Sequence, residues 1–476
     1  MAYTYGMLPA FSGVRMDLSE ALMSADQSPD ACNMDTRSGD LRTAGGFSRA
    51  ASGILSAQTP LLRMFLYPTE QGVRYLAVSR DALYYYRSAQ REWRQIHTFA
   101  NELSADRIDF LPVRIESQDR LLIVYGNGQP ILYNPLTHEI TPFGSAEKLS
   151  DVPVSCAELY FGRLFAAGNM LAPSRLYWSK APGADRGIDD WRQDPASENV
   201  SGGFVDIGVS DDPITGLAAL SNQLLIFTRN NVFRLLGDRP SNFRITAIDA
   251  AYEMPVHTAI VRYTDRLYFL SDGGLCCYDG QTVRRPANAA ALLPLLKEAK
   301  LDGTVSAACG DRLYFAFRSC DVVSYADTMI EYDLLRGTYM LRTGFLLADI
   351  QSLSGELYAL TSTGKLVRFD DSPDYDGDRI EAWWDMPVQD FGHKEANKTL
   401  LMLTASGEGD VLVRVLTNGG AYQTQAHFSD TPHSVTEIPL RGVGRVFRLS
   451  FSNVNGQPMR LDAKASLLFD VQRRPV

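Results

Sequence analysis

Histidine and cysteine are the residue types of this 476-residue chain best suited to metal binding or nucleophilic chemistry. None of the six histidines is spaced as H-x-x-x-H or H-E-x-x-H, the pattern that directs two imidazoles at one zinc ion. The six cysteines form no C-x-x-C pair, and the adjacent Cys276 and Cys277 lie in a strand pattern, which points their side chains to opposite faces. We therefore expect no metal site and no catalytic residue, and we expect buried, reduced thiols of a protein made in a cytosol. These residues are His97, His138, His257, His393, His427, His433, Cys32, Cys156, Cys276, Cys277, Cys309 and Cys320.

Two short stretches come nearer to a known binding motif. Asp374, Asp376 and Asp378 alternate like the start of a calcium loop, but Gly377 falls between the second and third aspartate and no helix pattern flanks them. Residues 271–274 begin like the S-x-D-x-G-x-T-W box of sialidase propellers but lack its Thr-Trp. No phosphate loop and no G-x-S-x-G elbow is present. The sequence therefore predicts a solvated acidic linker at 370–378, no cofactor and no enzyme activity.

A strand pattern recurs seven times and accounts for most of the chain. Turn residues are followed by arginine or a substitute, then by leucine and aromatics, most clearly as D-R-L-Y-F at 265–269 and 311–315. A second aromatic strand follows each copy, usually after a polar turn. A period of roughly 40–50 residues built from short strands is typical of a β-propeller. The marker positions are Arg74, Arg120, Arg163, Gln223, Arg266, Arg312 and Glu356, with gaps of 46, 43, 60, 43, 46 and 44 residues.

The predicted fold class is all-β, a seven-bladed β-propeller at 51–372 followed by a small antiparallel β-sandwich at 379–476. The sandwich is inferred from six strand patterns of a different kind, separated by turns such as Asn455-Gly456. Residues 1–50 hold no repeat and are predicted to form an extended N-terminal arm, part of which supplies a strand that closes the ring.

Irregularities in the period indicate where the ring carries additions. The long gap contains residues 180–199, rich in Asp, Gly, Pro and Ser, which predict an exposed loop on one face. Residues 287–300 are rich in Ala and Leu and predict a short helix at the ring edge.

Charge is distributed unevenly along the chain, whose net charge is −10. Residues 379–476 hold 11 basic and 10 acidic side chains, so residues 1–378 hold 35 basic and 46 acidic ones. Such an acidic surface disfavours nonspecific binding of nucleic acid. No apolar run approaches the ~20 residues of a membrane-spanning helix, and the start of the chain does not look like a secretory signal.

Several phrases in the first 290 residues resemble a broad group of tailed-bacteriophage virion proteins, which open with S-P-D-A-x-N-x-D and then x-G-x-L-R-x-R-x-G-F. The matching stretches here are 28–35 and 39–47, with Ala44 in place of the second arginine. The group is similar to the propeller-bearing nozzle and tail-hub proteins of short-tailed phages. Further matching phrases are S-R-L-Y-W-S-K at 174–180 with D-W at 190–191, and D-P-I-T-G-L at 212–217 with N-Q-L-L-I-F at 222–227.

The resemblance implies a structural protein of the viral tail that takes part in DNA ejection. We expect a homo-oligomeric, six-fold ring below the head–tail connector, located in the virion and assembled in the cytoplasm of the bacterial host. Its partners would be other copies of itself, the connector or adaptor and other tail proteins. Genomic DNA would pass without sequence-specific binding, and no part would insert in a membrane. The alternative is a receptor- or glycan-binding propeller at the tail tip, which predicts exposed aromatics and carboxylates in the central pocket.

Overall fold

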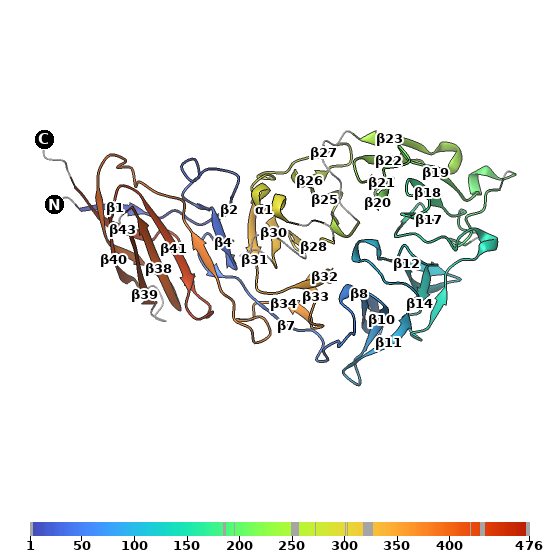
Figure 1. Cartoon of the computed structure of the whole chain (residues 1–476), viewed down its shortest axis with the longest axis horizontal. Coiled ribbons are helices and arrows are strands. Elements are labelled where there is room, and N and C mark those ends of the chain that lie inside the picture. Colours follow the sequence, from blue (N-terminus) through green and yellow to red (C-terminus); the bar gives the residue numbers. More distant parts are fainter. Residues whose placement is uncertain are drawn as a thin grey trace.

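In this computed structural model, a ring of seven sheets makes up most of the molecule (Figure 1). Six of these sheets have four strands, and the N-terminal segment extends the sheet of blade six to six strands. The described residues are 3–183, 187–194, 196–248, 257–271, 273–299, 301, 303–317, 327–418, 420–428 and 434–472. A β-sandwich lies beside the ring at the left of the view, together with both ends of the chain. The predicted all-β fold class with a β-propeller is confirmed.

The seven blades follow one another along the chain. The first three are β8 (Leu61–Thr69), β9 (Gly72–Ser79), β10 (Ala82–Arg87) and β11 (Glu92–Thr98); β12 (Asp109–Ile115), β13 (Gln118–Val124), β14 (Ile131–Tyr133) and β15 (Ile140–Pro142); and β16 (Cys156–Tyr160), β17 (Arg163–Ala167), β18 (Arg175–Trp178) and β19 (Gly203–Asp206). The fourth and fifth are β20 (Ile214–Leu220), β21 (Gln223–Thr228), β22 (Val232–Leu236) and β23 (Arg244–Ile248); and β24 (Ile260–Tyr263), β25 (Arg266–Ser271), β26 (Gly274–Tyr278) and β27 (Val283–Arg284). The last two are β28 (Val305–Cys309), β29 (Arg312–Ala316), β30 (Met329–Asp333) and β31 (Thr338–Arg342); and β32 (Leu347–Leu353), β33 (Glu356–Thr361), β34 (Leu366–Phe369) and β7 (Phe47–Arg49).

Every sequence marker lies in the second strand of its blade. Strand β21 shows why leucine and aromatics dominate there, because all six of its residues are buried. A blade packs against a neighbour on each face, so its central strands face apolar surface on both sides.

The N-terminal segment closes the ring, as predicted. Strand β7 pairs antiparallel with β34 and so completes blade seven with residues from the opposite end of the chain. Phe47 in β7 is buried and packs edge-on against Phe345 and Phe369. This pairing ties the two ends of the propeller sequence together within one blade.

Two main sheets form the sandwich. One is ordered β1 (Tyr3–Met7), β43 (Ser466–Val471), β36 (Lys398–Ala405) and β40 (Thr436–Gly444). The other is ordered β39 (Gly420–His427), β38 (Asp410–Thr417), β41 (Phe447–Asn453), β35 (Trp383–Asp385) and β4 (Asp30–Cys32).

The first 50 residues run between propeller and sandwich and add strands to both. Within this segment β2 (Gly13–Val14) pairs with β31 and, in parallel, with β3 (Gln27–Ser28), while β5 (Met34–Asp35) and β6 (Leu41–Thr43) join β42 (Arg460–Leu461) and β37 (Gly407–Glu408). Phe11 meets the ring of Trp384 edge-on at 5.5 Å. One continuous apolar cluster extends from Leu313 in blade six through this segment to Val413 in the sandwich.

Two predicted polar segments are more buried than their composition indicates. The prediction of an exposed loop at 180–199 is wrong for its described centre, where Asp190 and Trp191 are only 3% exposed. The prediction of a solvated linker at 370–378 is wrong at Tyr375, which is 1% exposed. In each case one aromatic side chain anchors a polar stretch in apolar surroundings. The helix predicted within 287–300 is present as α1 (Leu293–Glu298).

Candidate functional site

Asn33, from the phage-like phrase, connects three parts of the chain with one buried side chain. Its amide nitrogen donates to the carbonyl oxygens of Thr343 (3.2 Å) and Glu381 (2.8 Å). Its amide oxygen accepts from the Thr343 N–H (3.0 Å) and the Tyr375 hydroxyl (3.0 Å). Thr343 follows blade six, Tyr375 lies in the linker and Glu381 precedes the sandwich. All four hydrogen-bonding positions of the amide are therefore used to hold these parts together.

The backbone of Asn33 has a left-handed conformation, with φ of 54°. Asparagine tolerates this region better than most residues, which explains the residue type at this turn. The main chain is also fully engaged, because its N–H donates to Leu341 and its carbonyl accepts from Ala44, both at 2.8 Å.

Asp35 lies two residues further on and is ion-paired with Arg37 and Arg42. Burial by itself raises the pKa of the Asp35 carboxyl, but the hydrogen bonds and charges of the two arginines hold that pKa well below its usual range. Asp35 therefore stays ionised and fixes the turn between β5 and β6.

Phe47 and the two glycines before it hold the linker against blade seven. The Phe47 ring stacks on the Tyr375 ring at 4.9 Å, and the Gly46 N–H donates to the Ser372 carbonyl at 2.7 Å. A side chain at Gly46 would collide with the backbone of Asp374. We call Asn33, Asp35, Gly46, Phe47 and Tyr375 the joint.

The joint connects the propeller to the sandwich through hydrogen bonds between segments far apart in the sequence. The hydrogen bonds of Asn33 reach across 310 residues of chain to Thr343 and 348 to Glu381, and the Asn33 side chain itself is buried. Buried polar networks that are fully satisfied rigidify the elements they connect.

Three residues of the second set of phage-like phrases, Ser179, Lys180 and Asp190, also make architectural contacts. Arg163, which is 1% exposed, donates to the carbonyls of Ser179 (2.7 Å), Ser201 (2.8 Å) and Asn199 (2.5 Å). Asp190 binds Lys180 (3.1 Å) and Arg192 (2.7 Å) in the same loop. These contacts fix both ends of the loop between β18 and β19.

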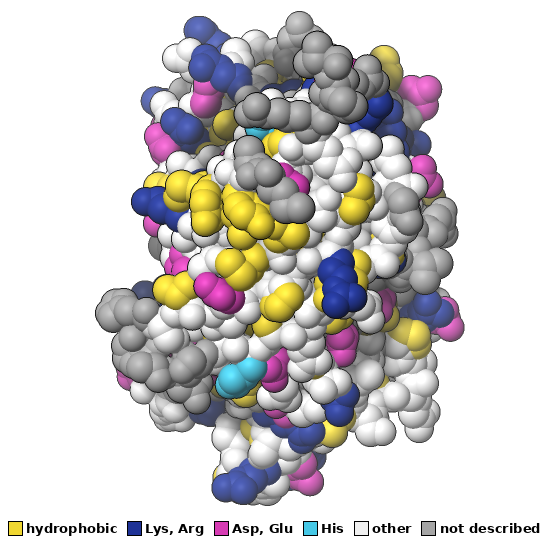
Figure 2. Space-filling view, turned by 90° about the vertical axis from the view of Figure 1, so that its left-hand side faces the viewer, with side chains coloured by type: hydrophobic (Ala, Val, Ile, Leu, Met, Phe, Trp, Pro, Cys, Tyr) yellow, Lys and Arg dark blue, Asp and Glu magenta, His cyan; other side chains and the backbone are white. Residues whose placement is uncertain are grey.

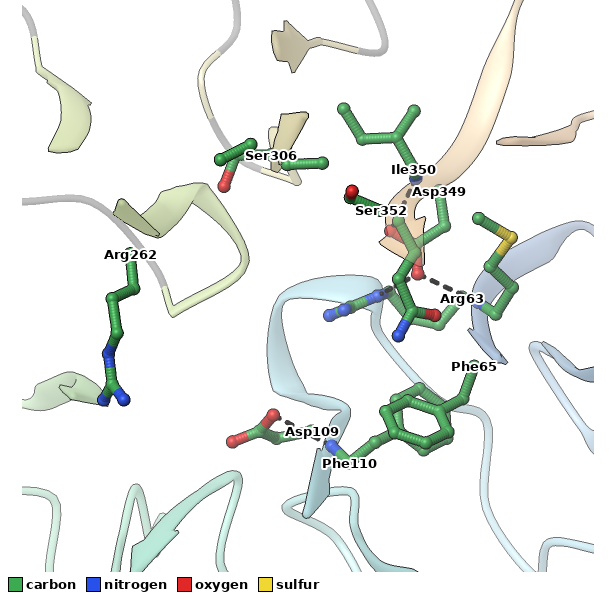
Figure 3. A pocket seen from close by; sticks show the side chains of 13 residues that line it. Arg63, Phe65, Asp109, Phe110, Arg262, Ser306, Asp349, Ile350 and Ser352 are labelled. Atoms are coloured by element: carbon green, nitrogen blue, oxygen red, sulfur yellow. Dashed lines mark hydrogen bonds and ion pairs between the residues drawn. The ribbon is translucent and has the colours of Figure 1, made fainter. Parts of the chain in front are cut away.

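A cavity of about 290 Å³ opens at the centre of the propeller (Figure 3). Arg63 and Asp349 form an ion pair at 2.7 Å on its wall, and Phe65 and Phe110 pack at 5.3 Å between ring centroids. Phe110 is only 8% exposed, so it presents little surface for stacking a ligand.

Carboxylates of the innermost strands connect three pairs of neighbouring blades. Such a strand is a sheet edge, whose outer N–H groups need acceptors. Burial raises the pKa of one of them, Glu158, and its backbone hydrogen bonds offset part of that rise. These carboxylates are therefore structural and not a free pair for glycoside hydrolysis. The contacts are Asp109 with the Ala157 N–H (3.1 Å), Glu158 with the Ala219 N–H (3.1 Å) and Asp349 with the Met64 N–H (2.9 Å).

A larger groove of about 730 Å³ lies at the rim, between the outer strands of blades one and two. His138 stacks on Tyr85 at 4.0 Å and its Nδ1 lies 2.7 Å from the Tyr133 hydroxyl. His138 has φ of 63°, at the turn position where blade six has Gly337. The groove therefore contains a histidine held in a conformation that favours glycine.

Two further histidines have defined hydrogen-bond partners. His257 is bound to the Ile108 carbonyl (2.8 Å) and His427 to Asp410 (3.0 Å), whereas His433 and Cys320 lie outside the described residues. Cys276 and Cys277 belong to different apolar clusters, so they point to opposite faces as expected. Among the described residues no group of three His, Cys, Asp or Glu side chains is placed to hold a metal ion. In the same part of the chain, no helix has the length and apolar character needed to cross a bilayer.

The fold defines this chain as a β-propeller protein with an appended β-sandwich. No protein-family model and no curated protein matches it. Two solved structures are similar to it at a TM-score of 0.42. Raptor from Chaetomium thermophilum has 10% identity, covering 68% of this chain and 28% of that one, so the match spans little more than a quarter of Raptor. BamB from Moraxella catarrhalis has 11% identity, covering 78% of this chain and 98% of that one.

Proposed function

We propose that this protein is a non-enzymatic structural component of a bacteriophage tail. Copies of it would form a nozzle or hub ring below the head–tail connector, most simply six-fold, that surrounds the DNA exit channel. Connector and other tail proteins would dock on the ring, and DNA would pass through it during ejection.

The observation that carries this proposal is that residues of the phage-like N-terminal stretches lie at the junction of propeller, linker and sandwich. Asn33, Asp35 and Phe47 all belong to the phage-like stretches. Asn33 bonds the end of blade six to the start of the sandwich, Asp35 fixes the turn between β5 and β6, and Phe47 holds the linker against blade seven. A ring that withstands DNA passage needs rigid wedges, and a fully bonded joint supplies rigidity. The excess of acidic over basic residues in 1–378 supports the proposed passage of DNA through the ring, because negative charge repels DNA and lets it slide.

A phage with an amber codon in this gene tests the proposal, with plating on suppressor and non-suppressor hosts. On the non-suppressor host we expect DNA-filled heads that lack a complete tail, and the protein supplied in trans should restore infectivity. Normal, infectious particles without the protein would overturn the proposal.

A second candidate function, recognition of a host glycan at the tail tip, is favoured by one feature, the rim groove with His138 and Tyr85. It does not draw support from the central cavity, whose carboxylates are engaged by backbone. The amber phage separates the two candidates, because loss of a receptor-binding protein leaves complete tails that fail to adsorb. A glycan array with no bound sugar would remove the second candidate.

A further inference from the structure

The outer sheet of the sandwich ends in an unguarded edge strand. In the order β1-β43-β36-β40, strand β1 pairs with β43 on one side, and no strand among the described residues pairs with the other side. Proteins usually protect such edges with charged residues, proline or a bulge. Strand β1, with the sequence Y-T-Y-G-M, has no charged residue or proline, and its register with β43 has no shift. Its outer N–H and C=O groups are therefore open to another strand.

An apolar stripe runs across the same sheet and ends at this edge. Tyr5 lies opposite Leu468, which lies opposite Met402, which lies opposite Pro439. The outward face of a sandwich sheet is ordinarily polar, so a row of four apolar residues is unusual there. Figure 2 shows hydrophobic side chains gathered on this end of the molecule. Exposure is high in β1 itself, at 60% for Tyr3, 72% for Tyr5 and 68% for Met7.

We propose that β1 and this stripe bind a second copy of the chain. The two β1 strands would pair antiparallel about a two-fold axis at Tyr5 and join both outer sheets into one continuous eight-stranded sheet. A two-fold contact uses the same patch on both subunits, so the patch must be complementary to itself.

The residue pattern of β1 meets that requirement. In this register Tyr5 faces Tyr5 of the partner subunit, Tyr3 faces Met7, and Thr4 faces Gly6. Outward side chains therefore meet outward apolar ones, and no charged residue of β1 enters the pairing. Cross-strand aromatic and apolar pairs of this kind stabilise a sheet. The stripe would then continue without interruption from one Pro439 to the other.

The inference does not depend on the proposed function. A six-fold ring is built from head-to-tail contacts between different patches, whereas this contact is two-fold and involves only the outer sheet. The two-fold contact through β1 can therefore be absent while the six-fold ring is present, and the reverse also holds.

Cysteine cross-linking tests the register directly, in a Cys309→Ser, Cys320→Ser background. Tyr5→Cys should form a disulfide-linked dimer under mild oxidation. Tyr3→Cys alone and Met7→Cys alone should not, but a mixture of these two should. Failure of Tyr5→Cys to cross-link, or equal cross-linking of the unmodified background, would overturn the inference.

Solution mass provides the second test, on the full chain. The wild type should sediment at twice its 52.7 kDa mass at micromolar concentration. Tyr5→Lys should raise the dimer dissociation constant by more than about tenfold, because it places two like charges directly opposite each other. Leu171→Lys, at a position 92% exposed on the propeller, is the matched control and should change nothing. A monomeric wild type, or a Tyr5→Lys variant that remains dimeric, would refute the pairing. A hexamer insensitive to Tyr5→Lys would refute it while leaving the tail-ring proposal intact.

Discussion

Replacing Asn33 by alanine should weaken the attachment of the propeller to the sandwich without unfolding either. The substitution leaves four groups without their partner, namely two on Thr343, the Glu381 carbonyl and the Tyr375 hydroxyl. The Tyr375 bond is buried and the other three are partly buried. Each unpaired buried group costs about 1–3 kcal/mol, and water entering the space of the lost amide offsets part of the sum. We expect a loss of about 4 kcal/mol in the free energy that holds the joint closed.

The backbone contributes a smaller, separable amount. Alanine at φ of 54° is strained by about 1 kcal/mol, whereas glycine is not. Asn33→Gly should therefore cost about 1 kcal/mol less than Asn33→Ala. Asn101→Ala, which removes an exposed side chain, is the control and should stay within about 0.5 kcal/mol of the wild type.

Hydrogen exchange of the amides in 372–382 measures opening of the joint without assuming that the whole chain unfolds in one step. Asn33→Ala should speed exchange there by about a thousandfold, the factor that corresponds to about 4 kcal/mol. Strand β21, the fully buried second strand of blade four, should keep its protection. Unchanged exchange in 372–382, or an equal effect from Asn101→Ala, would refute the reasoning.

Two further predictions concern the same region. Because the folded-state pKa of Asp35 is depressed, its ion pairs stabilise the fold above roughly pH 4, and this stabilisation is lost as the pH falls further. Between pH 6 and pH 2.5 the free energy of unfolding in urea should therefore fall by about 2 kcal/mol more for the wild type than for Asp35→Asn. An equal fall for the two proteins would contradict this prediction. Gly46→Ala should cost about 2–3 kcal/mol, because the new methyl group meets the Asp374 backbone, whereas Gly377→Ala, with open space around it, should cost only the ~1 kcal/mol of left-handed strain; equal urea midpoints for the two variants would exclude the collision.

The sequence predicts the ring well because blade geometry is encoded locally. Arg266 and Arg312 stand at the start of second strands whose apolar residues are buried on both faces, so a short window contains the whole signal. The closing strand was predictable for a related reason, since a non-repeating terminus must pair with the last blade.

The joint was not predictable, because its meaning depends on partners far along the chain. Asn33 looks like an ordinary turn residue until Thr343 and Glu381 are brought beside it. The buried loop centre and linker were missed because polar composition outweighed one aromatic residue in each, Trp191 and Tyr375. An isolated aromatic within a polar, turn-rich segment was the available signal in both places.

Single-particle imaging of tailed virions produced from the genome that encodes this chain tests the central proposal most directly. We predict a ring of propeller–sandwich bodies below the head–tail connector, with acidic propeller surface toward the DNA channel. Virions that lack the protein, a propeller placed far from the DNA path, or a basic channel face would contradict the proposed function.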